Sequence, residues 1–285
     1  MTLVCGVQMA PARGDAAGNT GLAVAELEAA AREGAALVAF PEAALTGYVF
    51  DAYEEALAAA VSADGPELAG IAEACRREDV WCVIGAIERE GERLFNSAFV
   101  IGPGGVAGRY RKVHTLCLGV DRFTHASEEG FRVFDLPFGR VGVHICYDGT
   151  FPEGPRTLRV LGAQLLLLPT NWPDLRLRRE LVQIRAHENH AYFFAVNRVG
   201  TEGGVRFEGG SSAADPMGEL LLCADDGPGR FYVEMDLASA DDTRIVVRRG
   251  AYEFDRVVDR RPEAYRPLVE APVTGTRTGS RKARG

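Results

Sequence analysis

Short apolar runs alternate with amphipathic segments along most of the chain. The apolar runs predict buried strands at 3–9, 36–40, 80–87, 95–101, 141–145, 165–168, 191–197, 211–214 and 231–236. Apolar residues at helical spacing predict helices between these runs, at 19–34, 64–75, 152–162 and 174–188. Asn19 or Thr20 should cap the first helix, and Asp174 the last. Continuous apolar strands that alternate with helices indicate sheets covered on both faces, and hence an α/β layered fold.

The alternation continues without an interdomain linker until the last residues. We therefore expect a single domain at 1–270, which the hydrophobic content of 47% can supply with a sizeable core. The segment 271–285 is rich in Thr, Gly, Arg and Lys, which predicts a flexible or partner-ordered tail. The chain shows neither an apolar stretch of about 18 residues nor a signal-peptide pattern, so we expect no membrane partner.

Charge and cysteine usage narrow the class of protein further. A formal net charge of −8 argues against nucleic acid or an anionic membrane as a partner, because both require a basic face. The six cysteines are scattered without CxxC spacing, which favours free thiols in a reducing cytoplasm over a disulfide framework or a zinc site. Most of them should be inert core residues, and one is a candidate for chemistry.

Three candidate chemical groups lie at the expected strand ends. Glu42 and Cys146 each follow a predicted buried strand, and Lys112 lies in the polar segment 109–114 after another. Strand ends converge in α/β folds, where a carboxylate can take a thiol proton and an ammonium can neutralise an oxyanion. Such neighbours would also favour the Cys146 thiolate. Taken singly, each residue has a structural alternative: a core cysteine, a loop or helix-start glutamate, and a solvated basic turn.

The segments around these residues carry motifs in series. FPEAALTGY at 40–48, YRKVH at 110–114 and GRVGVHICYDGTFPE at 139–153 resemble the glutamate, lysine and cysteine motifs of the nitrilase (carbon–nitrogen hydrolase) superfamily. Further similar segments are RAHEN at 185–189 and NRVG at 197–200. The resemblance covers residues 2 to 260 in the expected order, and it implies a four-layer α-β-β-α sandwich.

The resemblance also implies a mechanism without a metal or an organic cofactor. Glu42 would deprotonate Cys146, whose sulfur attacks the carbon of a C–N bond. Lys112 and the backbone N–H of Tyr147, a substrate-binding residue, would hold the oxyanion. Glu42 would then protonate the departing amine or ammonia and activate water against the thioester.

One departure from the family pattern concerns a second glutamate that braces the lysine in many relatives. The segment after Lys112 has no glutamate before Glu128, so Asp121 is the expected substitute, with Glu128 as the alternative. Tyr48, Asn171 and Trp172 are expected to bind substrate at the pocket wall. For Tyr48 and Trp172 a plain packing role is the alternative.

Within the superfamily, the segment CYDGTFPE at 146–153 is similar to amidases and carbamoyl-amide hydrolases, whereas nitrilases more often have Cys-Trp-Glu. The resemblance thus implies an amidase that acts on a small carboxamide and releases ammonia and a carboxylic acid. An N-carbamoyl-amine hydrolase or a nitrilase is the alternative within the family. A papain-like cysteine protease lacks its local signature here, and a catalytically silent binding protein would need a lost triad member. The family also implies a homodimer or a higher homo-oligomer.

Overall fold

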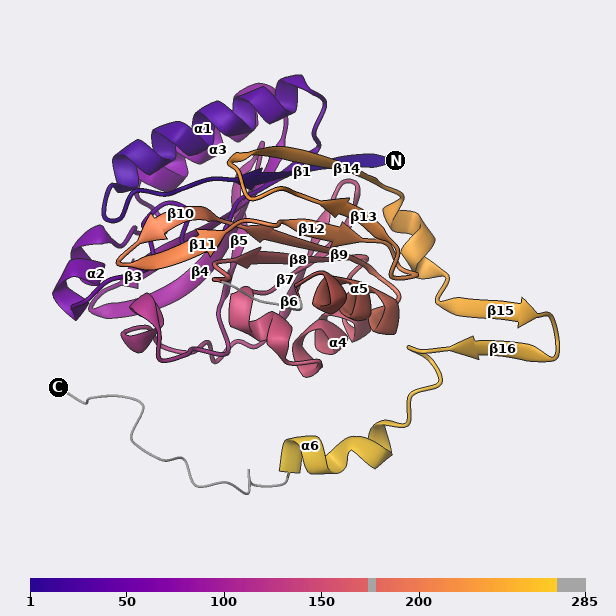
Figure 1. The fold of residues 1–285 in the computed structure, drawn as a ribbon. Helices are drawn as coiled ribbons and strands as arrows, with labels where there is room; N and C mark the ends of the chain where they lie inside the picture. Colours follow the sequence, from indigo (N-terminus) through magenta and orange to yellow (C-terminus); the bar gives the residue numbers. More distant parts are fainter. Residues whose placement is uncertain (174–177, 271–285) are drawn as a thin grey trace.

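Two six-stranded sheets lie face to face in the computed structural model, which describes residues 1–173 and 178–270 (Figure 1). The first sheet has the order β14-β1-β2-β3-β4-β5, formed by Gly229–Met235, Thr2–Gln8, Leu37–Ala39, Trp81–Glu90, Arg93–Gly102 and Gly105–Arg111. The second has the order β13-β12-β9-β8-β7-β6, formed by Leu220–Cys223, Ser212–Ala214, Tyr192–Asn197, Leu165–Thr170, Gly139–Val143 and Arg132–Leu136. In each sheet three central strands are parallel and the remaining pairs are antiparallel.

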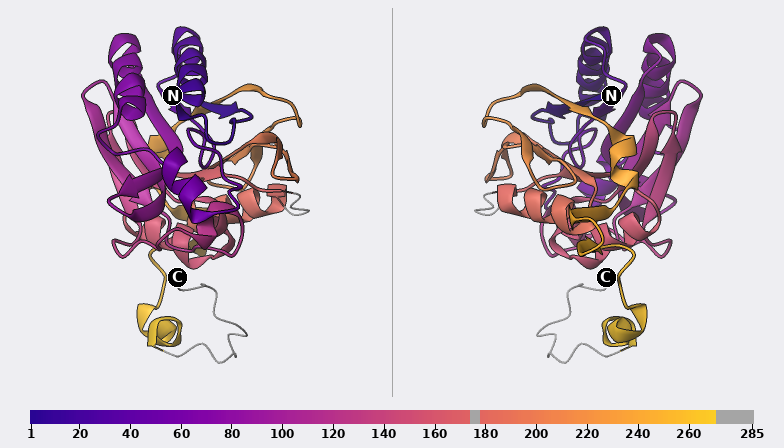
Figure 2. Two further views of the ribbon diagram at one scale, coloured as in Figure 1. Left: turned by 90° about the vertical axis from the view of Figure 1, so that its left-hand side faces the viewer. Right: turned by 90° about the vertical axis from the view of Figure 1, so that its right-hand side faces the viewer.

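Helices cover the outer face of each sheet. The helices α1 (Ala16–Arg32) and α3 (Pro66–Glu78) lie side by side on the first sheet (Figure 2). The helices α4 (Glu153–Val160) and α5 (Arg178–Asn189) cover the second sheet. This arrangement confirms the predicted α-β-β-α sandwich. No helix within 1–173 or 178–270 is long and apolar enough to cross a membrane.

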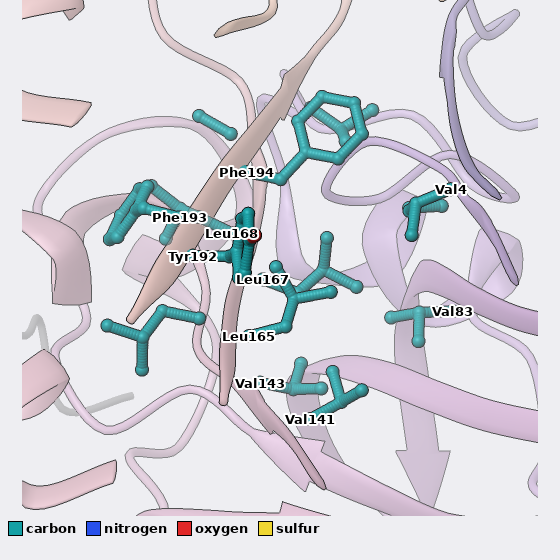
Figure 3. Packing of buried hydrophobic residues seen from close by; sticks show 14 of the residues in the cluster. Val4, Val83, Val141, Val143, Leu165, Leu167, Leu168, Tyr192, Phe193 and Phe194 are labelled. Carbon is teal, nitrogen blue, oxygen red and sulfur yellow. The ribbon is translucent and has the colours of Figure 1, made fainter. Parts of the chain in front are cut away.

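The inner core lies between the two sheets, where side chains of both inner faces interlock (Figure 3). Val4 and Val83 come from the first sheet, and Leu167 and Phe194 from the second. At Gly6 the sheets approach so closely that a Cβ atom would lie 2.5 Å from the Phe194 ring. Only glycine permits this approach without a shift of the ring.

The opposite face of the first sheet forms a second core against its helices. Because side chains alternate along a strand, Cys5 and Val7 of β1 point away from the second sheet. They pack with Leu27 of α1 and Ile71 of α3. The central strands are therefore buried on both faces, which explains their continuous apolar runs.

The predicted helix starts need correction. Helix α1 begins at Ala16, and its N-cap is Asp15, whose carboxylate accepts from the Gly18 N–H at 2.9 Å. Asn19 instead lies within the helix and exchanges hydrogen bonds with the backbone of Ala12. Asp15 is the N-cap because Ala16 and Ala17, which favour helix, lie between it and Asn19, so the helix begins earlier than predicted. Asp174, the other predicted cap, and the predicted tail at 271–285 lie outside the described residues.

Several short elements were not predicted from the sequence. These are β5, β6, β13, the helices α2 (Tyr53–Ala59) and α6 (Arg266–Glu270), and the hairpins β10–β11 (Val199–Glu202, Val205–Glu208) and β15–β16 (Arg244–Arg248, Tyr252–Asp255). Strands β5, β6 and β13 lie at sheet edges. Charged side chains interrupt β5 and β6, so these two lack a continuous apolar pattern, whereas β13 is a short apolar run that was not predicted. The β15–β16 hairpin projects from the sandwich (Figure 1).

Candidate active site

The candidate site combines side chains that follow strands of both sheets. Glu42 follows β2, and Lys112 directly follows the edge strand β5, both in the first sheet. Cys146 follows β7 of the second sheet and opens the 3-10 turn η2 (Cys146–Thr150). Strand β5 was not predicted, yet it is the element that places Lys112, because it pairs with β4 and brings the lysine next to Asn96.

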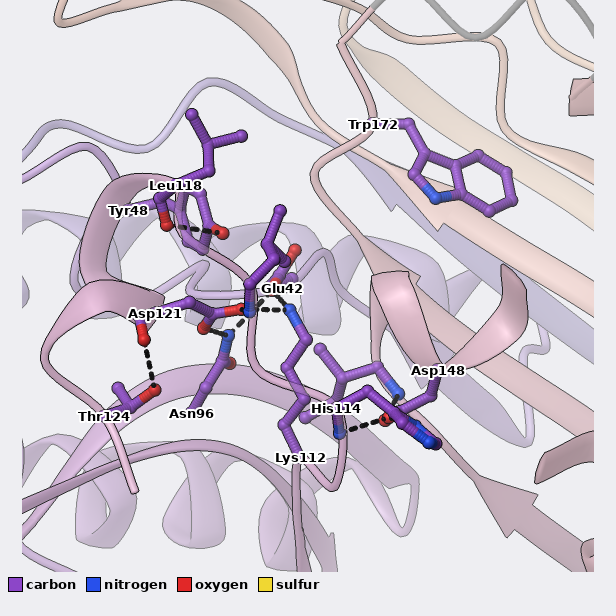
Figure 4. Close-up of polar contacts among 12 residues, drawn as sticks. Glu42, Tyr48, Asn96, Lys112, His114, Leu118, Asp121, Thr124, Asp148 and Trp172 are labelled. Atoms are coloured by element: carbon purple, nitrogen blue, oxygen red, sulfur yellow. Dashed lines mark hydrogen bonds and ion pairs between the residues drawn. The ribbon is translucent and has the colours of Figure 1, made fainter. Parts of the chain in front are cut away.

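Four buried residues form a closed cycle of hydrogen bonds that we call the charged ring: Glu42, Asn96, Lys112 and Asp121 (Figure 4). Lys112 Nζ donates to Glu42 Oε1 and to Asp121 Oδ2, each at 2.7 Å. Asn96 Nδ2 donates to Glu42 Oε1 at 2.7 Å and to Asp121 Oδ1 at 2.9 Å. Asp121 therefore lies where the family's second glutamate was expected, whereas Glu128 is exposed.

The charges of this ring are set by burial and by mutual attraction. Burial raises the pKa of Glu42, and the Asp121 carboxylate raises it further, while Lys112 opposes both. Burial alone would lower the pKa of Lys112, but Asp121 and Glu42 hold it well above its usual range. The lysine thus stays an ammonium between two carboxylates. A glutamate with a raised pKa and a buried Oε2 that has no hydrogen-bond partner in the described chain suits a proton acceptor.

Cys146 sits in a strained turn, since its φ of 46° lies in the left-handed region. Its side chain is almost fully buried, and burial raises the pKa of the thiol well above its usual range. Glu42 raises this pKa further, and Lys112 lowers it, so both groups act on the sulfur electrostatically. Burial therefore opposes the thiolate that the Lys112 ammonium favours. Desolvation, the largest of these effects, favours the neutral thiol.

Asp148 joins the cysteine turn to the lysine segment, and the sequence analysis gave it no role. Its Oδ2 accepts from the Ile145 N–H at 3.0 Å and from the Tyr110 hydroxyl at 2.7 Å. Its Oδ1 accepts from the His114 N–H at 2.9 Å and lies 2.8 Å from His114 Nδ1 (Figure 4). The only local signal was a carboxylate within an otherwise apolar buried segment.

Helix α5 supports the same turn from the other side. Arg185 Nε donates to the Gly149 carbonyl at 3.1 Å, and its second terminal nitrogen to the Thr150 carbonyl at 3.0 Å. Glu188 orients the guanidinium through an ion pair of 2.9 Å. The strained turn is therefore held by charged side chains at both ends.

The aromatic ring of Tyr48 lies next to the Lys112 ammonium of the charged ring. Its ring centroid lies 5.9 Å from Lys112 Nζ, and its hydroxyl donates to the Leu118 carbonyl at 3.1 Å. The Tyr48 N–H donates to Glu202 Oε1 at 2.6 Å, and Arg198 pairs with Glu202 Oε2 at 2.6 Å. The β10–β11 hairpin, which carries Glu202, thus anchors the loop of Tyr48.

The other expected pocket residues are Tyr147, which follows Cys146, and Asn171 and Trp172, which follow β8. Tyr147 is half-buried, with its ring edge-on to Phe151 at 5.0 Å. Asn171 is buried, and neither polar atom of its side chain has a hydrogen-bond partner within the described residues. The backbone N–H of the buried Trp172 donates to Asn197 Oδ1 at 2.9 Å. In Figure 4 Trp172 lies across the site from Asp121.

Within the described residues, no three His, Cys, Asp or Glu side chains are grouped to hold a metal ion. The sequence matches the model of the carbon–nitrogen hydrolase family over residues 3–245. The chain belongs to this family. With the buried Glu42–Lys112 pair beside Cys146, it is a carbon–nitrogen hydrolase of the nitrilase superfamily with a Glu-Lys-Cys triad.

Named relatives of the hydrolase agree with this assignment. It is 38% identical over 203 residues to a nitrilase from Pyrococcus abyssi, covering 71% of this chain and 75% of that protein. It is 35% identical over 207 residues to an (R)-stereoselective amidase from Pseudomonas sp., covering 69% and 70%. Among solved structures, an amidase from Nesterenkonia sp. matches with a TM-score of 0.78 at 25% identity, over 94% of this chain and 96% of that one.

Proposed function

We propose that this hydrolase cleaves the C–N bond of a small carboxamide and releases ammonia and a carboxylic acid through a thioester on Cys146. One observation carries the proposal. The buried Glu42 carboxylate has Oε1 held by Lys112 and Asn96, while its Oε2 has no partner in the described chain and its charge acts on the Cys146 thiol. A fixed base with one free oxygen beside a neutral nucleophile suits proton transfer coupled to attack.

In the acylation half, Glu42 Oε2 takes the thiol proton while the sulfur of Cys146 forms a bond to the amide carbon. The Lys112 ammonium and the backbone N–H of Tyr147 stabilise the developing negative charge on the amide oxygen. When the tetrahedral intermediate collapses, the C–N bond breaks and Glu42 returns its proton to the nitrogen, which leaves as ammonia. Asp121 keeps Lys112 oriented and protonated throughout.

In the deacylation half, Glu42 takes a proton from water, whose oxygen attacks the thioester carbon. Lys112 and Tyr147 again hold the oxyanion. The C–S bond then breaks, the Cys146 sulfur recovers the proton from Glu42, and the carboxylic acid departs. The same carboxylate thus acts as base and acid in both halves.

The net charge of the site supports an uncharged substrate. The charged ring holds two carboxylates and one ammonium, so it is net negative when both carboxylates are ionised. A substrate carboxylate nearby would be repelled in this buried environment. Tyr48, Asn171 and Trp172 would line the pocket, where the unpaired amide of Asn171 can bind a polar group of the substrate.

An N-carbamoyl amine is the second candidate substrate class. A carbamoyl group presents the same C–N bond to Cys146, and a cationic amine at its other end would be attracted by the net negative ring. The net negative charge of the ring therefore favours carbamoyl compounds with a cationic end over those with an anionic end.

The test is an ammonia-release screen over amides, carbamoyl compounds and nitriles, each in neutral, cationic and anionic forms. We expect turnover of a neutral carboxamide by the wild-type hydrolase and none by Cys146→Ala. Nitriles are included because one relative is named a nitrilase. Ammonia release by Cys146→Ala at the wild-type rate, or release from nitriles alone, would overturn the proposal.

We further propose that this hydrolase is a cytoplasmic protein and that it forms a homo-oligomer. All six cysteines are free thiols, which supports the compartment. Apolar side chains of the β15–β16 hairpin and α5 are exposed, among them Val247, Tyr252 and Ile184, and they would be covered by a second copy. Light scattering after size-exclusion chromatography measures the mass directly, and a monomer at micromolar concentration would contradict this proposal.

A further inference from the structure

Asn96 contacts every other member of the charged ring. It lies on β4 and is fully buried. Its side-chain nitrogen donates to Glu42 and to Asp121, and its backbone carbonyl accepts from the Lys112 N–H at 2.8 Å. One residue therefore links Glu42 to Lys112, which lies 70 positions further along the chain, and to the nearby Asp121.

The chemistry of an amide group constrains the carboxylates that it contacts. The NH2 of asparagine has two hydrogens and can only donate, and both hydrogens are used here. Glu42 Oε1 accepts from Asn96 and from Lys112, so this oxygen is occupied by two donors. The lone pairs of Oε2 remain as the place where Glu42 can take a proton.

Without the amide, the two buried carboxylates would lose one hydrogen bond each, and only the Lys112 ammonium would bridge them. Carboxylates that share a buried site retain a proton between them, because both cannot ionise cheaply. The hydrogen bond from Asn96 lowers the pKa of Glu42 and so opposes this outcome.

We propose that Asn96 is a positioning residue that fixes the carboxylates of Glu42 and Asp121 side by side and leaves Glu42 Oε2 as the acceptor for the Cys146 proton. The proposal rests on the proposed function, since it needs Glu42 to act as the base. It assigns Asn96 no contact with the substrate. Its removal should therefore affect proton transfer more than substrate binding.

The adjacent residue offers a matched control. Ser97 is equally buried on the opposite face of β4, where its hydroxyl donates to Glu88 Oε2 at 2.6 Å. Ser97→Ala removes a buried hydrogen bond from the same strand without touching the charged ring. If Asn96 only stabilised the fold, its substitution should affect the pH profile and kcat in the same way as Ser97→Ala.

The experiment compares wild type, Asn96→Ala, Asn96→Ser and Ser97→Ala. The rate of Cys146 alkylation by iodoacetamide is followed from pH 5 to 9 by peptide mass spectrometry, and kcat and KM are measured on the best amide. In Asn96→Ala the acidic limb of both profiles should move up by about one pH unit, because the pKa of Glu42 rises. Its kcat should fall by about 10-fold or more with KM little changed.

Asn96→Ser keeps one donor, so it should lie between the wild type and Asn96→Ala, and it serves if the alanine variant fails to fold. Ser97→Ala should keep the wild-type limb and kcat. Unmoved limbs in both Asn96 variants would overturn the proposal. The alkylation profile needs no substrate, so a protein that shows the expected shift but hydrolyses no amide would refute the proposed function and leave the role of Asn96 standing.

Discussion

Lys112→Met tests the electrostatics of the charged ring, because it deletes the ammonium and keeps a side chain of similar length. Lys112 is fully buried and makes two ion pairs of 2.7 Å, with Glu42 and Asp121. Removing one partner of a buried ion pair leaves charge uncompensated and costs about 3–5 kcal/mol. We therefore expect the free energy of unfolding to fall by this amount near pH 8. The kcat should fall by about 10²–10³, as for loss of an oxyanion donor.

The cost should depend on pH with a definite sign. In Lys112→Met the two carboxylates face each other, so the pKa of one rises in the folded state above its unfolded value. Such a group stabilises the folded state at low pH and loses that contribution as pH rises through the folded pKa. The deficit relative to wild type should thus shrink between pH 8 and pH 5, by about 1.4 kcal/mol for each unit of pKa shift.

Urea unfolding at pH 5, 6.5 and 8 measures this, with Lys112→Met/Asp121→Asn as the control. The double variant removes one of the facing charges, so it should recover stability at pH 8 by about 1–3 kcal/mol and still lack activity. A Lys112→Met deficit that is equal at pH 5 and pH 8, or that the second substitution worsens, would refute the reasoning.

Three further predictions concern other buried groups. Burial lowers the pKa of His144 to about 4, so stability should fall by up to about 3 kcal/mol as pH drops from 6.5 to 4; His144→Leu should flatten that part of the urea-unfolding profile. Glu202→Gln should cost about 3 kcal/mol in urea unfolding, because Arg198 loses the charge of its buried partner. It should also raise KM, because the amide has one acceptor oxygen where the carboxylate has two, and Arg198 and the Tyr48 N–H must compete for it; an unchanged KM would leave Glu202 purely structural. The exposed Cys117 should react with iodoacetamide before the buried Cys146, yet activity should be lost only as Cys146 reacts. Peptide mapping compared with residual activity measures both, and a loss of activity that follows the labelling of Cys117 would contradict this.

The central part of the fold was predictable because burial on both faces leaves a clear trace in sequence. Strands β1, β2 and β8 are largely apolar runs. Glu42 comes soon after the end of β2, and Cys146 soon after the end of β7, whose last three residues are buried. Such a run predicts a buried strand, and its end predicts where a ligand site can form.

Edge strands leave a weaker trace. The first five positions of strand β5 are exposed or half-buried, only its last two are buried, and it carries two arginines, so it resembles a polar loop. It pairs with β4 as a hairpin that turns between Gly102 and Gly105, so its polar composition, and not distance along the chain, hides it. The element that places Lys112 was missed for this reason.

The supporting residues of the site were out of reach for a different reason. Asn96 meets Glu42 across 54 positions of the chain, and Tyr110 meets Asp148 across 38. Contacts of this kind have no local spacing that a sequence pattern could reveal. The effect of burial on the Cys146 thiol was out of reach as well, because neighbouring charges can be inferred from motifs whereas the extent of desolvation cannot.

The most direct test of the central claim is the mass of the protein during turnover. The hydrolase is mixed with the best amide from the screen, quenched in acid within milliseconds to seconds, and examined as intact protein and as peptides. We predict a species heavier by the acyl group, carried on Cys146, that disappears as the substrate is consumed and never forms in Cys146→Ala. Ammonia release at a normal rate with no such adduct at any time, or an adduct on another residue, would contradict the account.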